Sequence, residues 1–281
     1  MSLFITSLNS GSNGNCYYIG NDTEAVLIDA GISCRETEKR MGLLGLSMDK
    51  VKAIFISHEH SDHIRGMGAI AEKHNLPVFI TNKTSHHCGV SVKRELRNIF
   101  VAHEAVKIGA LSITAFPKHH DAADPHSFIV SYNNINVGVF TDIGIACEQV
   151  TNYFSKCHAV FLEANYDEDL LANGNYPIYL KNRIRSGKGH LSNTQALDIL
   201  KQHRAPFLTH LLLSHLSRDN NDPELAKQLF EQHAGGVEII VASRYGQTAL
   251  YNILLQGSEQ ITDIKKSASK SSMRPNQLSL F

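Results

Sequence analysis

The sequence of 281 residues lacks several features that mark membrane, secreted and strongly charged proteins. No apolar run is long enough to span a bilayer, and the start of the chain has neither the basic residues nor the long apolar centre of a secretion signal. We therefore expect a cytoplasmic protein that does not bind membranes. The 27 basic side chains are balanced by 27 acidic ones, which excludes attraction of the whole molecule to nucleic acid. Binding to DNA or RNA would have to use local basic patches.

Cysteine is scarce as well. The five cysteines are odd in number, scattered along the chain and without CxxC spacing: Cys16, Cys34, Cys88, Cys147 and Cys157. This pattern argues against a disulfide framework and against a zinc site built from cysteine. We expect these residues to serve as small apolar side chains.

Hydrophobic residues make up 42% of the chain and charged residues 19%, so the chain can bury a sizeable core. Short β-branched runs alternate with helical patterns, which predicts a mixed α/β fold. The expected strands are 3–8, 16–19, 25–29, 51–57, 78–81, 111–116, 127–132, 135–141, 159–163, 207–214, 237–242 and 248–255. The expected helices are 34–45, 63–74, 145–155, 178–185, 193–203 and 223–233.

Local signals mark several element boundaries. Asn133-Asn134 is suited to a tight hairpin turn, because asparagine tolerates left-handed backbone conformations. Ser192 or Asn193 can cap the helix over 193–203, and Asp222-Pro223 provides a cap and a first-turn proline for the last helix. From Gly257 the periodicity ends in a segment rich in serine and lysine. We therefore expect a catalytic domain over 1–256 and a flexible basic tail over 257–281.

Histidine is abundant, with 16 copies, and imidazole is both a common metal ligand and an acid or base near neutral pH. The strongest pattern lies within residues 53–66, where an apolar strand ends in His58 and is followed by His60, Asp62 and His63. Residues two apart share one side of an extended chain, so His58 and His60 can bind one ion. Asp62 and His63 can then reach a second ion, as two-metal hydrolases require.

Three further apolar strands end in potential ligands, at His119/His120, at Asp142 and at His215. Strand ends at one edge of a sheet converge in layered α/β folds. The simplest assignment divides these side chains into two sets of three, one for each of two metal ions, with Asp142 bridging the two ions. These sets are His58, His60 and His120 for one ion, and Asp62, His63 and His215 for the other.

These ligands resemble those of the metallo-β-lactamase superfamily, whose fold is a four-layer αββα sandwich with a dinuclear site at one edge. Segments such as LIDAGIS at 27–33, LEANYD at 162–167 and LLLSHLSRDNN at 211–221 are similar to bacterial YycJ/WalJ-type hydrolases. In this register the ligand is His120 rather than His119. The resemblance implies two divalent ions, zinc or manganese, because oxygen and nitrogen ligands alone do not select between them.

Differences between this sequence and other members of the superfamily narrow the range of possible substrates. The commonest β-lactamases of this superfamily have cysteine where Asp142 stands, which argues against a β-lactam. The segment between Asp142 and His215 is too short for the inserted domain of β-CASP nucleases, and the exosite arm of tRNase Z is not evident. Two nearby ions suit phosphodiester hydrolysis by an activated hydroxide, although thioesters, lactones and cyclic phosphodiesters are alternatives.

Candidate catalytic residues follow from the resemblance. Asp62 would bind a metal and accept a proton, and His190 would contact the scissile phosphate or protonate the leaving oxygen. The alternative for His190 is a structural hydrogen bond in a helix-capping loop. Residues near His190 are candidates for substrate binding, with a solvated helix face as the alternative: Lys181, Arg183, Arg185, Lys188 and Ser192. Asp29, Glu163 and Asn165 are candidates for orienting the metal ligands.

The chain ends in QLSLF, which resembles the peptide by which bacterial polymerases and repair proteins hold the sliding clamp. Gln277 would supply hydrogen bonds, while Leu278, Leu280 and Phe281 would fill apolar pockets. A chance match, or a terminus folded onto its own domain, is the alternative. The YycJ/WalJ resemblance implies a 5′→3′ DNA exonuclease of mismatch repair, and tethering to the clamp would raise its effective concentration at DNA.

Overall fold

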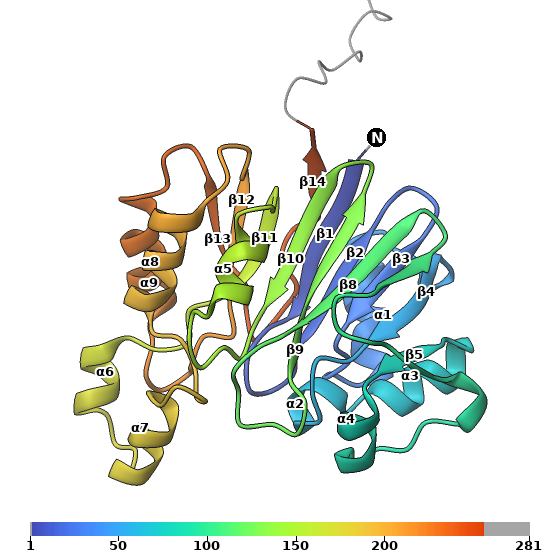
Figure 1. Cartoon of the computed structure of the whole chain (residues 1–281), viewed down its shortest axis with the longest axis horizontal. Helices are drawn as coiled ribbons and strands as arrows, with labels where there is room; N and C mark the ends of the chain where they lie inside the picture. The colour runs from blue at the N-terminus through green and yellow to red at the C-terminus, as the bar shows by residue number, and fades with distance from the viewer. Residues whose placement is uncertain (1, 256–281) are drawn as a thin grey trace, which may run out of the picture.

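The computed structural model describes residues 2–255, which form two seven-stranded β-sheets lying face to face (Figure 1). The first sheet has the order β14 (Tyr251–Leu254), β1 (Ser2–Asn9), β2 (Cys16–Gly20), β3 (Ala25–Ile28), β4 (Val51–Phe55), β5 (Val78–Ile80) and β6 (Arg97–Ile99). The second has the order β13 (Glu238–Val241), β12 (His210–Ser214), β11 (Ala159–Glu163), β10 (Ile135–Phe140), β9 (His126–Tyr132), β8 (Leu111–Pro117) and β7 (Ala105–Ile108).

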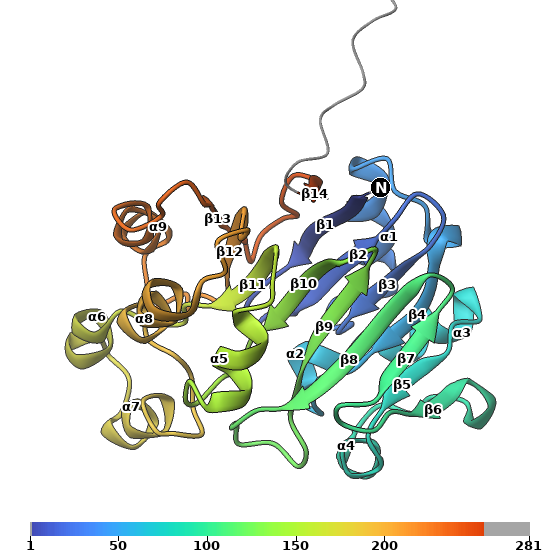
Figure 2. The same ribbon diagram turned by 45° about the horizontal axis from the view of Figure 1, so that its top comes forward.

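Helices cover the outer face of each sheet (Figure 2). The first sheet carries α1 (Cys34–Leu43) and α3 (Met67–His74), and the second carries α5 (Glu148–Phe154), α8 (Asn193–His203) and α9 (Pro223–Glu231). Shorter helices lie in the connections: η1 (Met48–Lys50), α2 (Ser61–Ile64), α4 (Asn82–His87), η2 (Arg94–Leu96), α6 (Glu168–Asn173) and α7 (Ile178–Ile184). The predicted four-layer αββα sandwich is confirmed.

Three apolar clusters hold the four layers together. Val26 and Ile28 of β3 point into the cluster between the two sheets, whereas Leu27 points into the cluster beneath α1 and α3. Successive side chains of a strand alternate between its two faces, so a strand buried on both faces needs an unbroken apolar run such as AVLI. A third cluster joins the second sheet to α5, α8 and α9. The buried strands are thus those that the sequence makes easiest to detect.

Each of the twelve predicted strands is present, with shifts of a few residues at their ends. The helix predicted over 63–74 is instead split into α2 and α3. At the break, the N–H of Gly66 donates to the carbonyl of Ala30, and a Cβ at this position would lie 1.8 Å from the carbonyl oxygen of Ile32. The chain therefore presses onto residues 30–32 at this point, where only glycine fits.

Predicted turns and caps are confirmed. Asn133 and Asn134 have φ values of 47° and 65°, as the hairpin between β9 and β10 requires. Ser192 caps α8, its hydroxyl accepting from the N–H of Gln195 while the Gln195 side chain bonds back in a capping box. Asp222 caps α9 ahead of Pro223.

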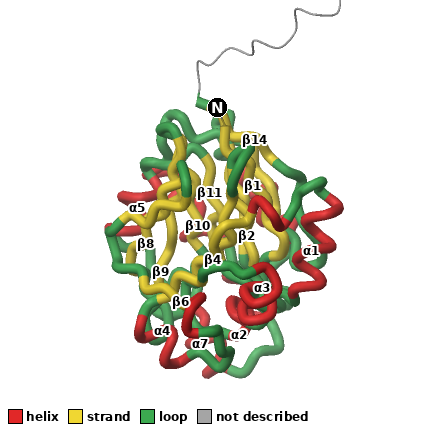
Figure 3. Tube along the Cα trace, turned by 90° about the vertical axis from the view of Figure 1, so that its right-hand side faces the viewer, coloured by secondary structure: helices red, strands yellow, loops and turns green. Residues whose placement is uncertain are grey.

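Parallel pairing of β3 with β4, and of β11 with β10 and β12, brings the carboxyl ends of these strands to the same end of each sheet. Helices α2 and α7 lie together at one end of the sandwich (Figure 3). The N-terminus lies at the opposite end (Figure 1). Within residues 2–255 no helix is both long and apolar enough to cross a membrane. The predicted tail over 257–281, with its terminal peptide, lies outside the described residues.

Candidate metal centre

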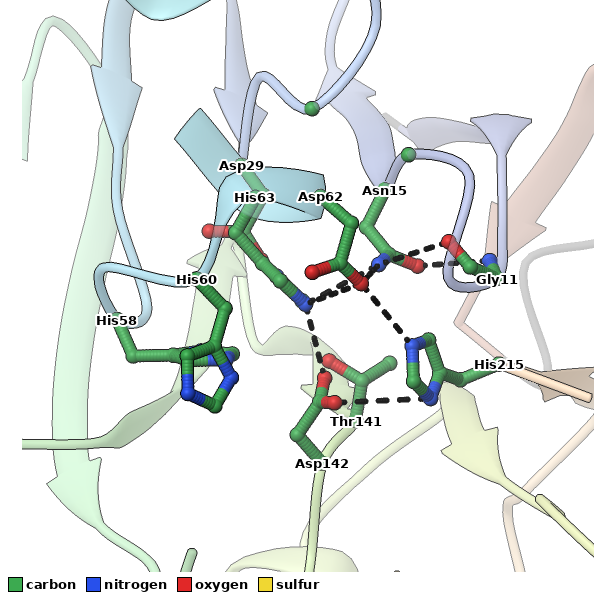
Figure 4. Close-up of polar contacts among 12 residues, drawn as sticks. Gly11, Asn15, Asp29, His58, His60, Asp62, His63, Thr141, Asp142 and His215 are labelled. Atoms are coloured by element: carbon green, nitrogen blue, oxygen red, sulfur yellow. Dashed lines mark hydrogen bonds and ion pairs between the residues drawn. The ribbon is translucent and has the colours of Figure 1, made fainter. Parts of the chain in front are cut away.

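The HisXHisXAspHis motif lies where β4 gives way to α2. His60 is the residue before the first turn of α2, and its carbonyl accepts from the N–H of His63 at 2.9 Å. This short helix turns the chain so that Asp62 and His63 face the same space as His58 and His60 (Figure 4). His58 and His63 are fully buried, whereas His60 and Asp62 are partly exposed.

The first predicted ligand set comes together in the fold. His60 Nδ1 lies 3.0 Å from His58 Nε2 and 3.3 Å from His120 Nε2. The neighbouring His119 side chain is exposed and takes no part. Three imidazole nitrogens facing one another across about a hydrogen-bond length, with no carboxylate oxygen among them, form a set that one cation can hold.

The second predicted set lies beside the first. Asp62 Oδ2 is 3.4 Å from both His63 Nε2 and His215 Nε2. Asp142 lies between the sets, with Oδ2 3.2 Å from His63 Nε2 and Oδ1 3.8 Å from His120 Nε2 (Figure 4). Its carboxylate therefore has the position that a bridging ligand would occupy.

One buried atom supports a bound cation in particular. Asp142 Oδ2 is buried but accepts no hydrogen bond from the described residues. His63 Nε2 lies 3.2 Å from this oxygen, so in the metal-free protein the protonated imidazole offsets its charge. A divalent ion at this position would satisfy the atom, so the donor set fits metal binding.

The imidazoles are held from behind by other residues. Asp29 Oδ2 accepts from His63 Nδ1 at 2.7 Å, and Glu163 Oε1 accepts from His215 Nδ1 at 3.1 Å. His120 Nδ1 donates to the carbonyl of Gly189 at 3.0 Å. Such bonds fix the tautomer and leave the opposite ring nitrogen free for a metal. Asp29 and Glu163 thus lie where the sequence places orienting residues.

The backbone conformation directly after three strands orients side chains toward the metal centre. Asp29, Asp142 and His215 all have positive φ, with values of 61°, 54° and 56°. Residues other than glycine adopt this left-handed region uncommonly, and such residues cluster at functional sites. Each follows a strand, so the turn redirects the side chain from the sheet toward the common centre.

In the metal-free cluster the histidines of the two ligand sets differ in protonation. Burial lowers the pKa of His120 to about 4 and also lowers that of His58, so both are neutral at pH 7. Burial opposes the charged form of His215 too, yet Asp142, Asp62 and Glu163 raise its pKa to about 10. Asp142, Asp29 and Asp62 likewise overcome burial and raise the pKa of His63. The second ligand set therefore carries the protons.

Metal binding to the second set should release about two protons at pH 7, because His63 and His215 must become neutral to act as ligands. We expect isothermal titration of metal-free protein with Zn²⁺ to give heats that vary with the ionisation enthalpy of the buffer, and an affinity that rises with pH. Heats independent of the buffer would contradict this charge distribution. In the metal-free protein, the stabilisation from His215 is complete below its ordinary pKa of 6.5 and is lost as pH rises through about 10.

Gly31 is required by the close contact of two loops at the site. The N–H of Asn15 donates to the carbonyl of Asp62, and a Cβ on Gly31 would lie 1.6 Å from that same carbonyl oxygen. We expect Gly31→Ala to destabilise the fold by about 1–3 kcal/mol or more in urea denaturation and to lower the metal content. Gly42→Ala is the matched control, since a Cβ there meets nothing within 4 Å and should stabilise α1 by about 0.5–1 kcal/mol. Equal effects of the two substitutions would contradict this account.

A pocket of about 280 Å³ lies over the cluster, and its lining includes one of the five candidate substrate residues, Arg183. His190 and Arg183 line this pocket, and His190 Nδ1 donates to Glu163 Oε1 at 2.8 Å. Arg183 is paired with Asp121 at 2.5 Å. Lys181 donates to the carbonyl of Ala172, while Arg185 and Lys188 are exposed to solvent.

Ser192 differs from the other candidates for substrate binding. Its side chain is buried, and its hydroxyl is engaged in the cap of α8.

Two residues at the site were missed by sequence reasoning. Asn15 Nδ2 lies 3.1 Å from both Asp62 Oδ2 and His63 Nε2. Lys118 is buried, and its ammonium donates to the carbonyl of Thr141, directly before Asp142, at 2.6 Å. Burial lowers the pKa of Lys118. No pattern in the sequence marks the side chain of Asn15 or of Lys118 as part of the site.

The sequence of this chain is similar to those of known proteins. The model of the β-lactamase superfamily domain matches residues 24–215. The chain is 34% identical to exodeoxyribonuclease YycJ of Bacillus anthracis over 244 residues, covering 84% of this chain and 92% of that protein. It is 31% identical to exodeoxyribonuclease WalJ of Streptococcus pneumoniae, covering 78% and 83%.

Solved structures share the fold at low identity. YhfI of Bacillus subtilis, a metallo-β-lactamase-fold protein, has a TM-score of 0.68 at 15% identity and covers 90% of this chain and 100% of its own. Zn²⁺-bound PqqB of Methylobacterium extorquens has the same TM-score at 12% identity, with the same coverage. Together with the histidine and aspartate cluster, the family match supports binding of a divalent metal by this chain.

Proposed function

Because this chain belongs to the β-lactamase superfamily and, within it, to the group of YycJ and WalJ, we propose that it is a metal-dependent exonuclease that degrades DNA from the 5′ end. One observation carries the proposal: two ligand sets, joined by Asp142, lie beneath a pocket bordered by His190 and Arg183. The proteins named exodeoxyribonuclease match 84% and 78% of this chain.

Seven side chains would hold two divalent ions, zinc or manganese. They are His58, His60, Asp62, His63, His120, Asp142 and His215. Bound ions of this kind lower the pKa of water and neutralise charge on the reacting phosphate oxygens.

Two residues of the chain would handle protons. Asp62 borders the pocket, and His63 and His215 together overcome its burial and lower its pKa, so it is ionised and able to bind a metal. Its role as proton acceptor is part of the proposal and requires that His63 and His215 lose their protons when the metal ions bind. His190 is held at Nδ1 by Glu163, which leaves its other nitrogen to donate to the leaving oxygen. Glu163 keeps its charge although it is buried. The charge of His190 and hydrogen bonds from His190 and His215 outweigh the effect of burial and lower the pKa of Glu163 to about 2.

The basic residues of α7 and the following loop would bind the phosphodiester backbone. Arg183 lines the pocket, and its pairing with Asp121 holds the guanidinium near His120. Arg185 and Lys188 extend positive charge away from the site on an exposed surface. Phosphate binding by a few such residues is sequence-independent and weakens with salt, as suits a nuclease that must cleave any sequence.

The test uses purified protein, Mn²⁺ or Zn²⁺, and DNA labelled at either the 5′ or the 3′ end. We expect stepwise release of nucleotides from the 5′ end, and a loss of about 100-fold or more in His190→Ala, as is typical for a general acid. His119→Ala is the matched control, because that histidine is exposed and lies outside the cluster. No DNA degradation, with rapid turnover of a cyclic phosphate, a thioester or a lactone, would replace the proposal with one of those activities.

We further propose that the terminal peptide recruits the enzyme to replication or repair sites, with mismatch repair as the process served. Gln277, Leu278, Leu280 and Phe281 lie outside the described residues, so the sequence alone supports this step. Double substitution of Leu280 and Phe281 by alanine should abolish binding to purified sliding clamp while metal content stays constant. Clamp binding that survives the substitution would exclude the peptide as the tether.

A further inference from the structure

A second pocket, of about 250 Å³, adjoins the metal centre and is not used by the chemistry described so far. It lies between the loops that follow β12 and β13, and we call it the β12–β13 pocket. Its lining residues include Ser10, Leu216, Arg218, Ala242, Arg244 and Tyr245.

The pocket shares structural elements with the metal centre. Leu216 directly follows the ligand candidate His215, and the hydroxyl of Ser10 accepts from the N–H of His215 at 2.7 Å. The loop over 9–15 lies between the two pockets: Ser12 lines the pocket over the metal cluster, and Asn13 donates to the carbonyl of Arg244 at 2.7 Å. The two pockets are therefore neighbours on either side of this loop.

Its floor is apolar. Leu216 and Ala242 are buried and Val241 is partly buried, and the ring of Pro223 completes the lining. Planar apolar groups are favoured in such a pocket because little polar surface is desolvated when they bind.

Its rim is aromatic and positively charged. Tyr245 is 76% exposed, so the face of its ring is accessible to a ligand. The Arg244 guanidinium lies 5.9 Å from the centre of that ring and, among the described residues, has no carboxylate within ion-pair distance. Arg218 is paired with Asp219 at 3.0 Å, and Asp219 also accepts from the hydroxyl of Tyr176. The rim therefore offers one arginine without a carboxylate partner and one that Asp219 holds in place.

We propose that the β12–β13 pocket binds one deoxynucleotide of the substrate strand, adjacent to the scissile phosphate, with its base on Tyr245 and its phosphate at Arg244. The assignment of a DNA strand rests on the proposed function. An exposed aromatic face accepts any base by stacking, and a guanidinium binds phosphate without reading sequence, which matches the needs of an exonuclease. An apolar floor beside the two arginines of the rim fits a nucleotide better than a bare phosphate.

The absence of tryptophan from the chain allows a direct test. Tyr245→Trp introduces a single tryptophan, which can be excited selectively over the tyrosines, and stacking of a base should quench its emission. We expect saturable quenching by deoxyadenosine monophosphate and none by deoxyribose 5-phosphate, which lacks the base. Adding Arg244→Ala to this variant should weaken nucleotide binding by several-fold. Leu43→Trp, at an exposed position of α1 outside both pockets, is the control and should not respond.

Binding of single-stranded DNA provides the second readout. Tyr245→Ala should weaken binding of single-stranded DNA by about 5- to 150-fold, the range found for removal of one stacking side chain. Absence of quenching, or equal quenching by the base-free sugar phosphate, would overturn the pocket assignment even if the enzyme degrades DNA. Quenching by the nucleotide in a protein that fails to degrade DNA would instead uphold the pocket and overturn the proposed exonuclease function.

Discussion

Asp142→Asn is expected to remove at least one of the two metal ions and to lower DNA degradation by more than about 100-fold. Loss of a residue that only supports a metal ligand typically costs 10–100-fold, and Asp142 lies in contact distance of both ligand sets. Asparagine is the informative replacement, because it tolerates the left-handed backbone that Asp142 adopts at a φ of 54°. The substitution therefore removes the charge while leaving the turn in place.

Metal content by elemental analysis, together with degradation of end-labelled DNA, checks this expectation. Asp198→Asn makes the same chemical change at an exposed position of α8 and should leave both quantities unaltered. Asp142→Asn protein that retains two ions and near-full activity would show that the carboxylate does not bridge them.

The fold was predictable because most of its signals are local. Strands buried on both faces need continuous apolar runs such as AVLI and AVFLE, and helices α8 and α9 carry their own caps. The strands β6 and β7 and the helices α4 and α6 were missed. Side chains of β6 and β7 are mostly exposed or partly exposed, so their sequences lack the long apolar run that marks a buried strand.

Some residues of the candidate site could likewise be predicted from local sequence signals, and others could not. Ligands within the motif, and those directly after a strand, could be located from the sequence because topology brings the ends of neighbouring strands together. The choice between His119 and His120 could not be made from alternation, because both follow the end of β8 at Pro117 in an irregular loop. That choice came from the family resemblance. Asn15 and Lys118 depend on contacts between distant loops, which no local pattern encodes.

Burial also separates two roles that the sequence cannot distinguish. Asp29 and Asp142 both follow apolar strands and both have positive φ. Asp29 Oδ1 and Oδ2 accept from Ser57 and His63, whereas Asp142 Oδ2 accepts no hydrogen bond from the described residues. A carboxylate that accepts from a backbone N–H and from the far nitrogen of a ligand imidazole positions other groups, whereas one that faces the metal-binding nitrogens of His63 and His120 is placed to share their cation.

Asp29→Asn should then have the largest effect on stability among the residues that do not bind metal directly. Asp29 is fully buried and accepts from the N–H of Ser57 at 2.8 Å and from His63 Nδ1 at 2.7 Å. Removing one partner of a buried charged pair typically costs about 3–5 kcal/mol. An asparagine N–H facing His63 Nδ1 would also move the ring proton to Nε2, the nitrogen that faces the metal, and should lower metal affinity by about 10–100-fold.

Urea denaturation of the metal-free protein and a Zn²⁺ titration separate these two consequences. Asp22→Asn, in an exposed turn of the same N-terminal sheet, controls for loss of one negative charge and should alter neither quantity. The tautomer can be tested by the pH dependence of metal affinity: loss of the Asp29 charge lowers the pKa of His63, so fewer protons should be released on binding than in the unaltered protein. Reduced stability with unchanged proton release would mean that Asp29 only supports the fold, and reduced metal affinity with unchanged stability would mean that its charge acts on His63 alone.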